Sequence, residues 1–310
     1  MKRIQYHQYG GPDVMRLEDF APARPGAGEV LVRVRAAAVN PYDWKVRNGE
    51  MKMMTGRKFP RGMGHDFAGV VEAVGQGVTR LSVGDEVLGA SQIKAGGAFA
   101  EMVVADEKGV TKKPAGLSFE EAAAIPTIGV AALQALVNKG KLQPRQAVFV
   151  HGCLGGVGRA TIQIASARGA AVAGSCRASA MQDARDLGIA PVVEFDSVPT
   201  TLKGQFDIVF DTVGTLPPTT ARMLLKSGGR IVDIVPTPAK FVRSVLPGPY
   251  KVLITQHNAK DLDELARACA HGTLRVPIAQ TVPLGDAIAA LTELERNNKP
   301  RGGKLIITAS

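Results

Sequence analysis

The sequence predicts an α/β protein in which a doubly wound parallel sheet is inserted into a discontinuous, barrel-like β domain. Three observations support this prediction. Residues 1–117 contain short alternating strands separated by glycine, residues 118–272 alternate apolar strands with helices, and a final strand at 303–308 has no place in a completed parallel sheet. We therefore expect a first domain over 1–117 and 273–310 and an inserted second domain over 118–272.

Composition and charge restrict the classes of protein to which the chain belongs. With 45% hydrophobic and 21% charged residues, it has the composition of an ordinary globular protein, which excludes collagen and long disordered tails. Lysine and arginine exceed aspartate and glutamate by 38 to 28, a net charge of +10. The densest basic stretch, residues 45–61, lacks any zinc-finger or RNP-like pattern. We expect no nucleic-acid partner there, but a solvated loop or one that attracts an anionic cofactor or substrate.

Cysteine content and apolar segments indicate the compartment. The three cysteines, at positions 153, 176 and 269, are too few and too widely spaced for a disulfide framework. No secretory signal pattern is present at the N-terminus, and no segment reaches roughly 18 uninterrupted apolar residues. These observations predict a cytoplasmic protein with no membrane span.

The elements of the first domain are predicted from alternation. Runs at 30–36, 69–75 and 99–104 alternate with a period of two and are separated by glycine, which is typical of an antiparallel barrel. The pattern changes at Ser118. Ser118 and Glu121 have the spacing of a capping box, and an alanine-rich helix follows to about Val137.

The elements of the second domain are predicted from apolar strands that alternate with helices. Strands buried on both faces of a parallel sheet appear as continuous apolar runs. Strands are expected at 147–151, 171–175, 192–195, 206–211, 230–235 and 251–255, with helices at 156–168, 178–187, 219–225 and 261–271. A strand at 276–282, a helix at 285–297 and the strand at 303–308 then return to the first domain.

A glycine-rich turn between the first strand and the first helix of this sheet is the strongest functional motif. Backbone N–H groups and the positive dipole end at such a helix start bind a pyrophosphate, and glycine lets the chain approach it closely. Cys153 replaces the first glycine of the usual GxGxxG pattern, but strand, turn, helix and second strand follow at the expected intervals. The motif therefore predicts a Rossmann-type dinucleotide site rather than a purely structural turn. Its binding residues are Gly155, Gly156, Val157 and Gly158.

The end of the second strand indicates which dinucleotide binds. An NAD site usually has an acidic residue for the ribose 2′-hydroxyl, whereas an NADP site has a small polar residue and a cation. Ser175 and Arg177 occupy this strand end, and no acidic residue occurs between Gly158 and Asp183. We expect NADPH, with Ser175 and Arg177 binding its 2′-phosphate. The alternative is that Arg177 is a solvated cation at a helix start.

A third segment follows the strand 206–211, at the carboxyl edge where ligands collect in such sheets. Thr212, Val213 and Gly214 are expected to pass beside the adenosine and ribose. A simple strand-to-helix turn explains the same residues nearly as well.

Further motifs are distributed over nearly the whole chain. They are Ala38-Val39-Asn40-Pro41-Tyr42-Asp43-Trp44-Lys45, Gly64-His65-Asp66-Phe67-Ala68-Gly69, Val83-Gly84-Asp85-Glu86-Val87, Gly97-Ala98-Phe99-Ala100-Glu101, Pro126-Thr127-Ile128-Gly129 and Arg301-Gly302-Gly303-Lys304-Leu305. With the glycine turn, they resemble the medium-chain dehydrogenase/reductases, in the zinc-free quinone oxidoreductase branch. The N-P-x-D-x-K version of the first motif is most similar to chloroplast-envelope quinone oxidoreductase homologues and alkenal/enone reductases. The resemblance implies a Rossmann domain inserted in a discontinuous GroES-like catalytic domain.

The ligands of a catalytic zinc are missing. Zinc-dependent members of the superfamily use a Cys, a His and a second Cys, and a catalytic zinc needs about three protein ligands. Asn40 and Thr127-Ile128-Gly129 stand where the two cysteines would be, and the segment 91–97 has neither the length nor the cysteines of a structural zinc lobe. His65 matches the middle position but is alone, and a lone histidine is more often a structural hydrogen bonder. We expect no metal site.

The resemblance implies NADPH-dependent reduction of a quinone or of an α,β-unsaturated ketone or aldehyde. This reaction needs a hydride, polarisation of a carbonyl and a proton, but no Lewis acid. In the resembled family the matching Asn40 lies near the nicotinamide ribose, Asp43 organises the loop, and Lys45 lies where an ammonium stabilises a developing enolate. Tyr42 is at a variable position, and its phenol is a candidate proton donor. The alternatives are a cation on a cofactor phosphate for Lys45 and a pocket wall for Tyr42.

The resemblance also implies contacts farther along the chain. Thr127 is expected at the nicotinamide carboxamide, and Lys304 is expected to reach the cofactor from the closing strand. The stretch 236–249, rich in proline and glycine, is expected to form a mobile wall of the substrate pocket. Related enzymes commonly pair their last cofactor-domain strand, so we expect a homodimer through 251–255.

Two other functions remain open. An enoyl-thioester reductase would use the basic loop at 57–61 for its substrate, and a non-catalytic NADPH-binding protein, such as a redox sensor, would use the fold without turnover. Loss of NADPH absorbance with a quinone, an alkenal, an enone and an enoyl-CoA separates these possibilities.

Overall fold

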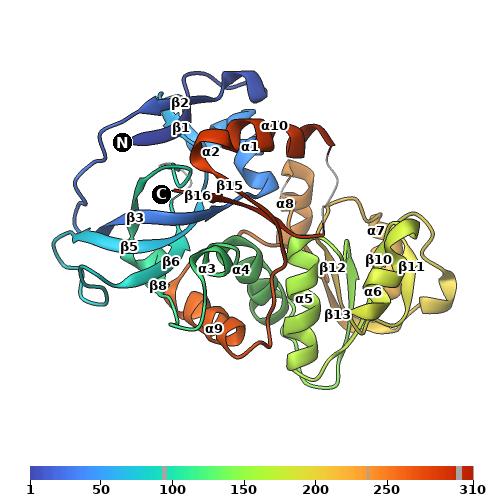
Figure 1. Cartoon of the computed structure of the whole chain (residues 1–310). Coiled ribbons are helices and arrows are strands. Elements are labelled where there is room, and N and C mark those ends of the chain that lie inside the picture. The colour runs from blue at the N-terminus through green and yellow to red at the C-terminus, as the bar shows by residue number, and fades with distance from the viewer. Residues whose placement is uncertain (93–95, 236, 298–301, 310) are drawn as a thin grey trace. The chain divides into compact units, whose positions relative to one another are not determined.

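The chain forms two compact units (Figure 1). The computed structural model describes residues 1–92, 96–235, 237–297 and 302–309, so Pro236 and Arg301 lie outside the described residues. The first unit contains Met1–Thr127, His257–Gly272 and Val276–Ser310, and the second contains Ile128–Gln256 and Thr273–Arg275. The second unit is therefore inserted in the sequence of the first, while the domain boundaries at 117/118 and 272/273 stay a prediction.

The first unit is built on a seven-stranded sheet that is antiparallel except between β15 and β16. The strand order is β15-β16-β3-β5-β6-β8, and β7 pairs with β3. These strands are β3 (Glu29–Ala38), β5 (Asp66–Val74), β6 (Glu86–Ala90), β7 (Met102–Asp106), β8 (Val110–Lys112), β15 (Ile278–Pro283) and β16 (Lys304–Thr308). A smaller sheet has the order β2-β1-β4, with β1 (Lys2–Tyr6), β2 (Arg16–Asp19) and β4 (Arg61–Gly62).

Alternating burial explains why these segments form the sheet. In β3, Val30, Val32 and Val34 are buried in the core, whereas Arg33 and Arg35 are exposed. The period of two places the valines on the core face of the strand. The helices of this unit are α1 (Pro41–Arg47), α2 (Lys52–Thr55), α3 (Phe119–Ala123), α9 (Ala259–Ala270) and α10 (Ala287–Asn297).

A buried ion pair joins two of these helices. Arg47 of α1 and Glu295 of α10 approach to 2.7 Å, and the Arg47 side chain is only 1% exposed. The guanidinium also donates to the carbonyl of Gly10. This pair connects α1, which carries the N-P-x-D-x-K motif, to α10. The two paired residues are 248 positions apart in the sequence.

The second unit is built on a six-stranded parallel sheet with the order β11-β10-β9-β12-β13-β14. Its strands are β9 (Ala147–His151), β10 (Ala171–Cys176), β11 (Val192–Glu194), β12 (Phe206–Asp211), β13 (Leu225–Asp233) and β14 (Tyr250–Val252). In register, His151 lies opposite Ser175 on one side and Asp211 on the other. The carboxyl ends of β9, β10 and β12 therefore meet at one edge of the sheet.

Helices cover this parallel sheet. They are α4 (Pro126–Gln134), a π-helical continuation at Ala135–Lys139, α5 (Gly156–Ala167), α6 (Met181–Asp186), α7 (Pro218–Leu224) and α8 (Pro238–Val245). α5 packs against β9 and β10, and α7 packs against β12 and β13. Because the chain leaves β9 in one direction along the sheet and β12 in the other, right-handed crossovers place α5 and α7 on opposite faces.

The predicted fold class is confirmed, although several element boundaries differ. β7 begins at Met102, since Ala100 forms only an isolated bridge with Arg3, and β13 begins five residues before the expected strand at 230–235. The proline-rich stretch 236–249 contains α8, which begins after the N-cap Thr237 with Pro238 at its first position. A threonine N-cap followed by proline is a favourable helix start.

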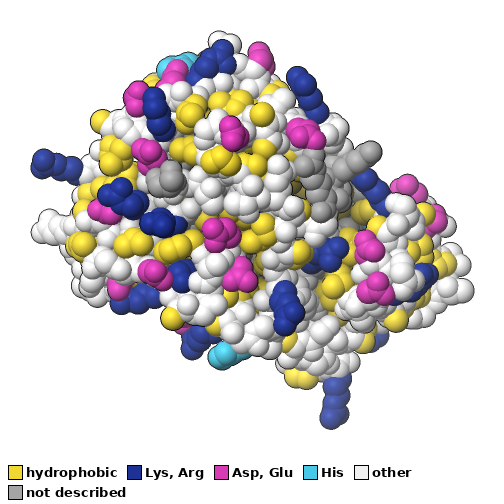
Figure 2. Space-filling view, viewed as in Figure 1, with side chains coloured by type: hydrophobic (Ala, Val, Ile, Leu, Met, Phe, Trp, Pro, Cys, Tyr) yellow, Lys and Arg dark blue, Asp and Glu magenta, His cyan; other side chains and the backbone are white. Residues whose placement is uncertain are grey.

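Charge is dispersed on the surface that Figure 2 shows. Over the coloured part of this face, lysine and arginine side chains are interspersed with acidic ones and form no continuous basic patch. Within the part of the chain that the structure describes, none of the helices has the length and hydropathy needed to cross a lipid bilayer.

Candidate active site

The glycine turn of the second unit requires glycine at two of its positions, Gly152 and Gly158. It connects β9 to α5, and Gly152 within it has a φ of +82°. A Cβ on Gly158 would lie 2.2 Å from the carbonyl oxygen of Gly152 and 2.8 Å from the Cα of Cys153. Gly158 therefore lets the start of α5 pack directly on the turn.

The start of α5 leaves backbone donors for a ligand. Its N-cap, Gly155, has no side chain to accept from the first helical N–H groups, and Gly155 and Gly156 are both exposed. Arg159, in the first turn of α5, donates from Nε to the carbonyl of Leu154 and so stabilises the turn that precedes the helix. A tight turn with free N–H groups at a helix N-terminus suits an anionic group such as a pyrophosphate.

The strand end of β10 differs from expectation at Ser175. Its side chain is fully buried, and its Oγ lies 2.7 Å from Nδ1 of His151 on the adjacent strand. Burial lowers the pKa of His151, so the imidazole is neutral at neutral pH. The Ser175 hydroxyl thus contacts the neighbouring strand β9 and not the solvent. Arg177, just beyond the strand, is exposed. Ser179, also exposed, is a hydroxyl at this edge that sequence reasoning missed.

Thr212, Val213 and Gly214 lie against the glycine turn. Asp211 Oδ1 accepts from the N–H groups of Val213 at 3.0 Å and Gly214 at 2.7 Å. The Thr212 hydroxyl donates to the carbonyl of His151 at 2.7 Å. A Cβ on Gly152 would meet the side chains of Thr212 and Val213 at 2.5 Å. The structure therefore brings this predicted segment together with the glycine turn.

In the first unit, Asp43 is the centre of a buried hydrogen-bond network. Its Oδ2 accepts from the backbone N–H of Asn40 at 2.7 Å, and its Oδ1 accepts from Nδ1 of His65 at 2.8 Å. The Asp43 side chain has no exposure. Asp43, the third residue of α1, thus caps the start of this helix and orients His65. Its role in organising a cofactor loop stays a prediction.

Asp66 connects the same network to Thr127 and Lys304. It accepts from Nδ2 of Asn40 at 2.9 Å, from the backbone N–H of Thr127 at 3.0 Å and from the Thr127 hydroxyl at 2.6 Å. Lys304 donates to Oδ1 of Asn40 and, at 3.1 Å, to the carbonyl of Val39. Burial lowers the pKa of Lys304. In this structure Lys304 is buried and orients Asn40 from within the fold.

Tyr42 contacts this network, whereas Lys45 does not. The Tyr42 ring packs edge-on against the His65 imidazole, with centroids 4.8 Å apart. Burial, and secondarily the charge of Asp43, raises the pKa of the Tyr42 phenol. Both Tyr42 and Lys45 are partly exposed, and within the described chain the Lys45 ammonium makes no hydrogen bond or ion pair.

Two histidines complete this corner of the first unit. Nε2 of His65 and Nε2 of His257 are buried and have no hydrogen-bond partner among the described residues. Burial lowers the pKa of His257, while the nearby Asp66 opposes this effect. Sequence reasoning treated His65 as a structural residue, and no motif distinguished His257, which precedes α9 far from the other residues in sequence.

The donor set does not fit zinc. Within the described residues, no group of three His, Cys, Asp or Glu side chains is arranged to hold a metal ion. Cys153 and Cys176 belong to the second unit, Cys269 lies in α9, and all three are free. Burial raises the pKa of Cys153 and of Cys269 to about 12, which disfavours the thiolate that binds zinc.

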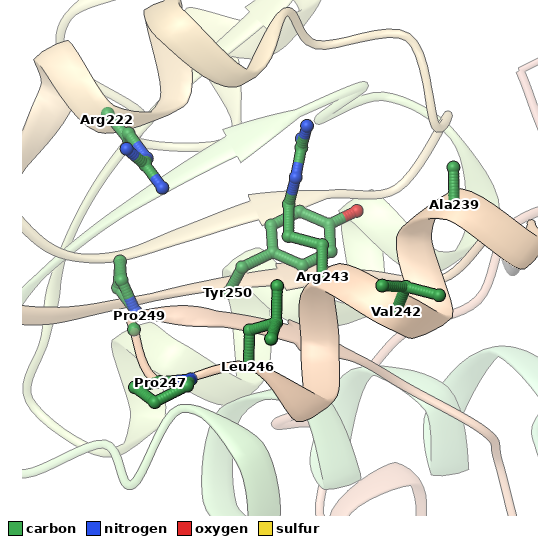
Figure 3. A pocket seen from close by; sticks show the side chains of 9 residues that line it. Arg222, Ala239, Val242, Arg243, Leu246, Pro247, Pro249 and Tyr250 are labelled. Carbon is green, nitrogen blue, oxygen red and sulfur yellow. The ribbon is translucent and has the colours of Figure 1, made fainter.

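A hollow of about 310 Å³ lies at the other edge of the second unit, beside β14 (Figure 3). Its wall includes Arg222, Arg243 and the ring of Tyr250, with Leu246 and Val242 as apolar neighbours. β14 is the last strand in the sheet order, three positions from β9, or about 14 Å at the usual strand spacing. The hollow is therefore separate from the glycine turn.

Comparison with known proteins assigns the family. Residues 26–115 match the alcohol dehydrogenase GroES-like domain, and residues 187–307 match the zinc-binding dehydrogenase family. The quinone oxidoreductase of Pseudomonas aeruginosa is 31% identical over 315 residues, which cover 94% of this chain and 95% of that protein. The chain belongs to the medium-chain dehydrogenase/reductase family. It falls in the quinone oxidoreductase branch and is an oxidoreductase, so the predicted resemblance is confirmed.

Other members of the medium-chain dehydrogenase/reductases share both sequence and fold. A 2-methylene-furan-3-one reductase of Solanum lycopersicum is 36% identical over 267 residues, covering 83% of this chain and 66% of that protein. The quinone oxidoreductase of Coxiella burnetii superposes with a TM-score of 0.89 at 30% identity, over 100% of this chain and 99% of that chain. The Escherichia coli quinone oxidoreductase, solved in complex with NADPH, superposes with a TM-score of 0.83 at 26% identity, over 99% and 100%.

Proposed function

We propose that the protein is a zinc-independent, NADPH-dependent reductase that transfers a hydride to a quinone or to the C=C bond of an α,β-unsaturated ketone or aldehyde. The observation that carries this proposal is the glycine cradle between β9 and α5, together with the cationic end of β10. A Cβ would fill the cradle at Gly158, 2.2 Å from a carbonyl oxygen. Such a cradle fits the pyrophosphate of a dinucleotide.

NADPH would be held by residues of the second unit. The backbone N–H groups of Gly156, Val157 and Gly158 would bind the pyrophosphate. Gly155 would let the chain approach it, since its own N–H donates to the carbonyl of Gly152 at 3.0 Å. Thr212, Val213 and Gly214, which lie against the turn, would line the ribose.

The 2′-phosphate would bind at the end of β10. Arg177 is exposed there and would pair with the phosphate, since a guanidinium offers two parallel donors to it. Ser175 was the predicted hydroxyl, but it is bound to His151, so we assign this role to Ser179. The Escherichia coli relative described as complexed with NADPH supports the same cofactor.

Asn40, Lys45 and Thr127 are proposed as cofactor contacts of the first unit, and Lys304, predicted as a further contact, is proposed to position Asn40. Asn40 and Thr127 are oriented by Asp66, and Lys304 would act through Asn40. Only Lys45 has a side chain that is free to turn toward a phosphate or a carbonyl.

The chemistry would be divided between cofactor and chain. Bound NADPH supplies the hydride. Lys45 would stabilise the negative charge that develops on the substrate oxygen, Tyr42 is a candidate proton donor, and Asp43 fixes the loop that carries both. Carbonyl activation by these groups needs no metal.

The substrate class is supported by the relatives. One is described as a quinone oxidoreductase and another as a 2-methylene-furan-3-one reductase.

The test is loss of NADPH absorbance with a quinone, an alkenal, an enone and an enoyl-CoA. We expect turnover with one of the first three. Turnover with the enoyl-CoA alone would favour the thioester reductase, and tight NADPH binding without any turnover would favour a non-catalytic protein.

A homodimer through β14 is part of the proposal. Among the described strands, β14 pairs only with β13, so its outer edge is free to pair with a second copy. Val242, Val245 and Leu246 expose 60%, 81% and 54% of their surface beside this edge. Sedimentation should show a dimer that Val245→Asp dissociates, and a wild-type monomer would refute the interface. We also propose a cytoplasmic location, supported by the three free cysteines.

A further inference from the structure

His65 presents a buried nitrogen that nothing in the described protein satisfies. The side chain is 7% exposed, and Nε2 has no hydrogen-bond partner among the described residues. A buried polar atom without a partner destabilises the folded state. Natural proteins retain such atoms where a ligand or a function completes them. Nε2 of His257, in the same unit, is in the same situation.

Asp43 determines the protonation of the His65 ring. Its carboxylate lies 2.8 Å from Nδ1 and also accepts from the N–H of Asn40. A carboxylate only accepts hydrogen bonds, so Nδ1 carries a proton. Nε2 is therefore the position at which the ring gains or releases its second proton. The Tyr42 ring packs against the imidazole and fixes its orientation from another side.

Charged side chains surround His65. Asp43 and Asp66 supply two negative charges, and the buried Lys304 supplies one positive charge that acts on both carboxylates. His257 interacts electrostatically with both His65 and Asp66, and its burial favours the neutral ring, which offers one donor or acceptor at Nε2.

We propose that Nε2 of His65 binds the substrate oxygen that becomes negative during reduction and gives it a proton, with His257 as a second hydrogen-bond partner. This inference rests on the proposed reductase function. Reduction of a C=C bond conjugated to a carbonyl requires a hydride, which the cofactor supplies, and one proton. As the hydride adds to the β-carbon, the π electrons move to the carbonyl oxygen. The N–H bond at Nε2 breaks, an O–H bond forms, and the electron pair stays on nitrogen.

The imidazole is then neutral, with its Nδ1 proton still shared with Asp43, and water restores the second proton. With a quinone the same transfer yields a quinol oxygen. Removing one donor to a developing oxyanion typically lowers kcat by about 10²–10³-fold. We expect an effect of this size at His65.

Two substitutions separate the roles of the two ring nitrogens. His65→Asn keeps an amide nitrogen near the position of Nδ1 for Asp43 and removes the outer nitrogen. His65→Gln places an amide donor near the position of Nε2, but this amide has no proton to transfer. Tyr6→Phe is the matched control, because it removes another buried oxygen that has no hydrogen-bond partner among the described residues.

The first measurement is binding rather than turnover. 4-Nitrophenolate mimics an anionic enolate or quinol oxygen, and its visible absorbance reports its ionised form. We expect the protein with NADP⁺ to bind the phenolate, His65→Asn to weaken it at least tenfold, and His65→Gln and Tyr6→Phe to stay within threefold of wild type. In turnover, both His65 variants should lose about 10²-fold in kcat, while their NADPH dissociation constants stay unchanged.

The outcomes are distinguishable. A working reductase whose His65→Asn variant binds phenolate and turns over like wild type would overturn the inference, as would variants that lose only thermal stability. A wild-type protein that reduces no substrate of the panel, yet binds phenolate through His65, would refute the reductase while supporting His65 as the oxyanion-binding group.

Discussion

Replacing Gly158 with alanine should abolish NADPH binding. The added Cβ would lie 2.2 Å from the Gly152 carbonyl oxygen and 2.7 Å from the carbonyl carbon of Cys153, whereas real Cβ atoms essentially never approach closer than 3.0 Å. Both neighbours are backbone atoms, so no side chain can move aside. The turn or the start of α5 must shift by about 0.8 Å. A displacement of this size removes the alignment of the N–H groups with a pyrophosphate.

The expected loss is at least about 100-fold in the NADPH dissociation constant, or about 2.7 kcal/mol. Overpacking should also cost about 1–3 kcal/mol of folding stability. NADPH fluorescence titration measures the first effect and urea unfolding the second. Gly285→Ala is the control, because a Cβ there meets nothing within 4 Å and Gly285 lies in the first unit. Binding by Gly158→Ala within threefold of wild type would refute the steric argument.

Four further outcomes are expected. If Tyr42 rather than His65 gives the proton, Tyr42→Phe should lower kcat/KM about 100-fold without changing the melting temperature, and an unchanged value would leave Tyr42 as a pocket wall. Arg177→Gln should weaken NADPH about 10- to 100-fold and leave NADH unaffected, whereas equal losses would exclude a 2′-phosphate contact. Glu295→Gln leaves Arg47 buried without its partner and should cost about 3–5 kcal/mol in urea unfolding, and a cost below about 1 kcal/mol would contradict this. Burial lowers the folded-state pKa of His151, so the unfolded chain binds more protons, and stability should fall as the pH decreases below 6.5. Urea titrations at several pH values should show a smaller decrease in His151→Asn, and an equal decrease would show that other groups cause it.

The sequence predicts the glycine turn well because local rules determine it. The strand 147–151 was predicted at its observed bounds, and the glycines at 155, 156 and 158 stand at the expected helix start. These positions depend on backbone sterics and on apolar runs, both of which are visible in one segment.

Side-chain direction was not predictable in the same way. Ser175 was expected to face the cofactor. The register between β9 and β10 places it opposite His151 instead, and the Ser175 hydroxyl forms its only described hydrogen bond with the ring of His151. Likewise, Lys304 was expected to reach the cofactor from the closing strand, yet its ammonium is buried against Asn40. Both outcomes depend on residues more than 20 positions away, which no local pattern reveals.

The first unit is completed by residues from the far end of the chain, so it cannot finish folding until the ribosome has synthesised them. β16 pairs with β3 through Ile306 and Ala38, and Lys304 orients Asn40. At about 5–20 residues per second, a ribosome needs about 10–35 s to proceed from Thr127 to Lys304. During this interval β3 has no β16 partner, whereas the second unit can already fold. We expect nascent-chain proteolysis to detect a protease-resistant second unit before the first unit is protected.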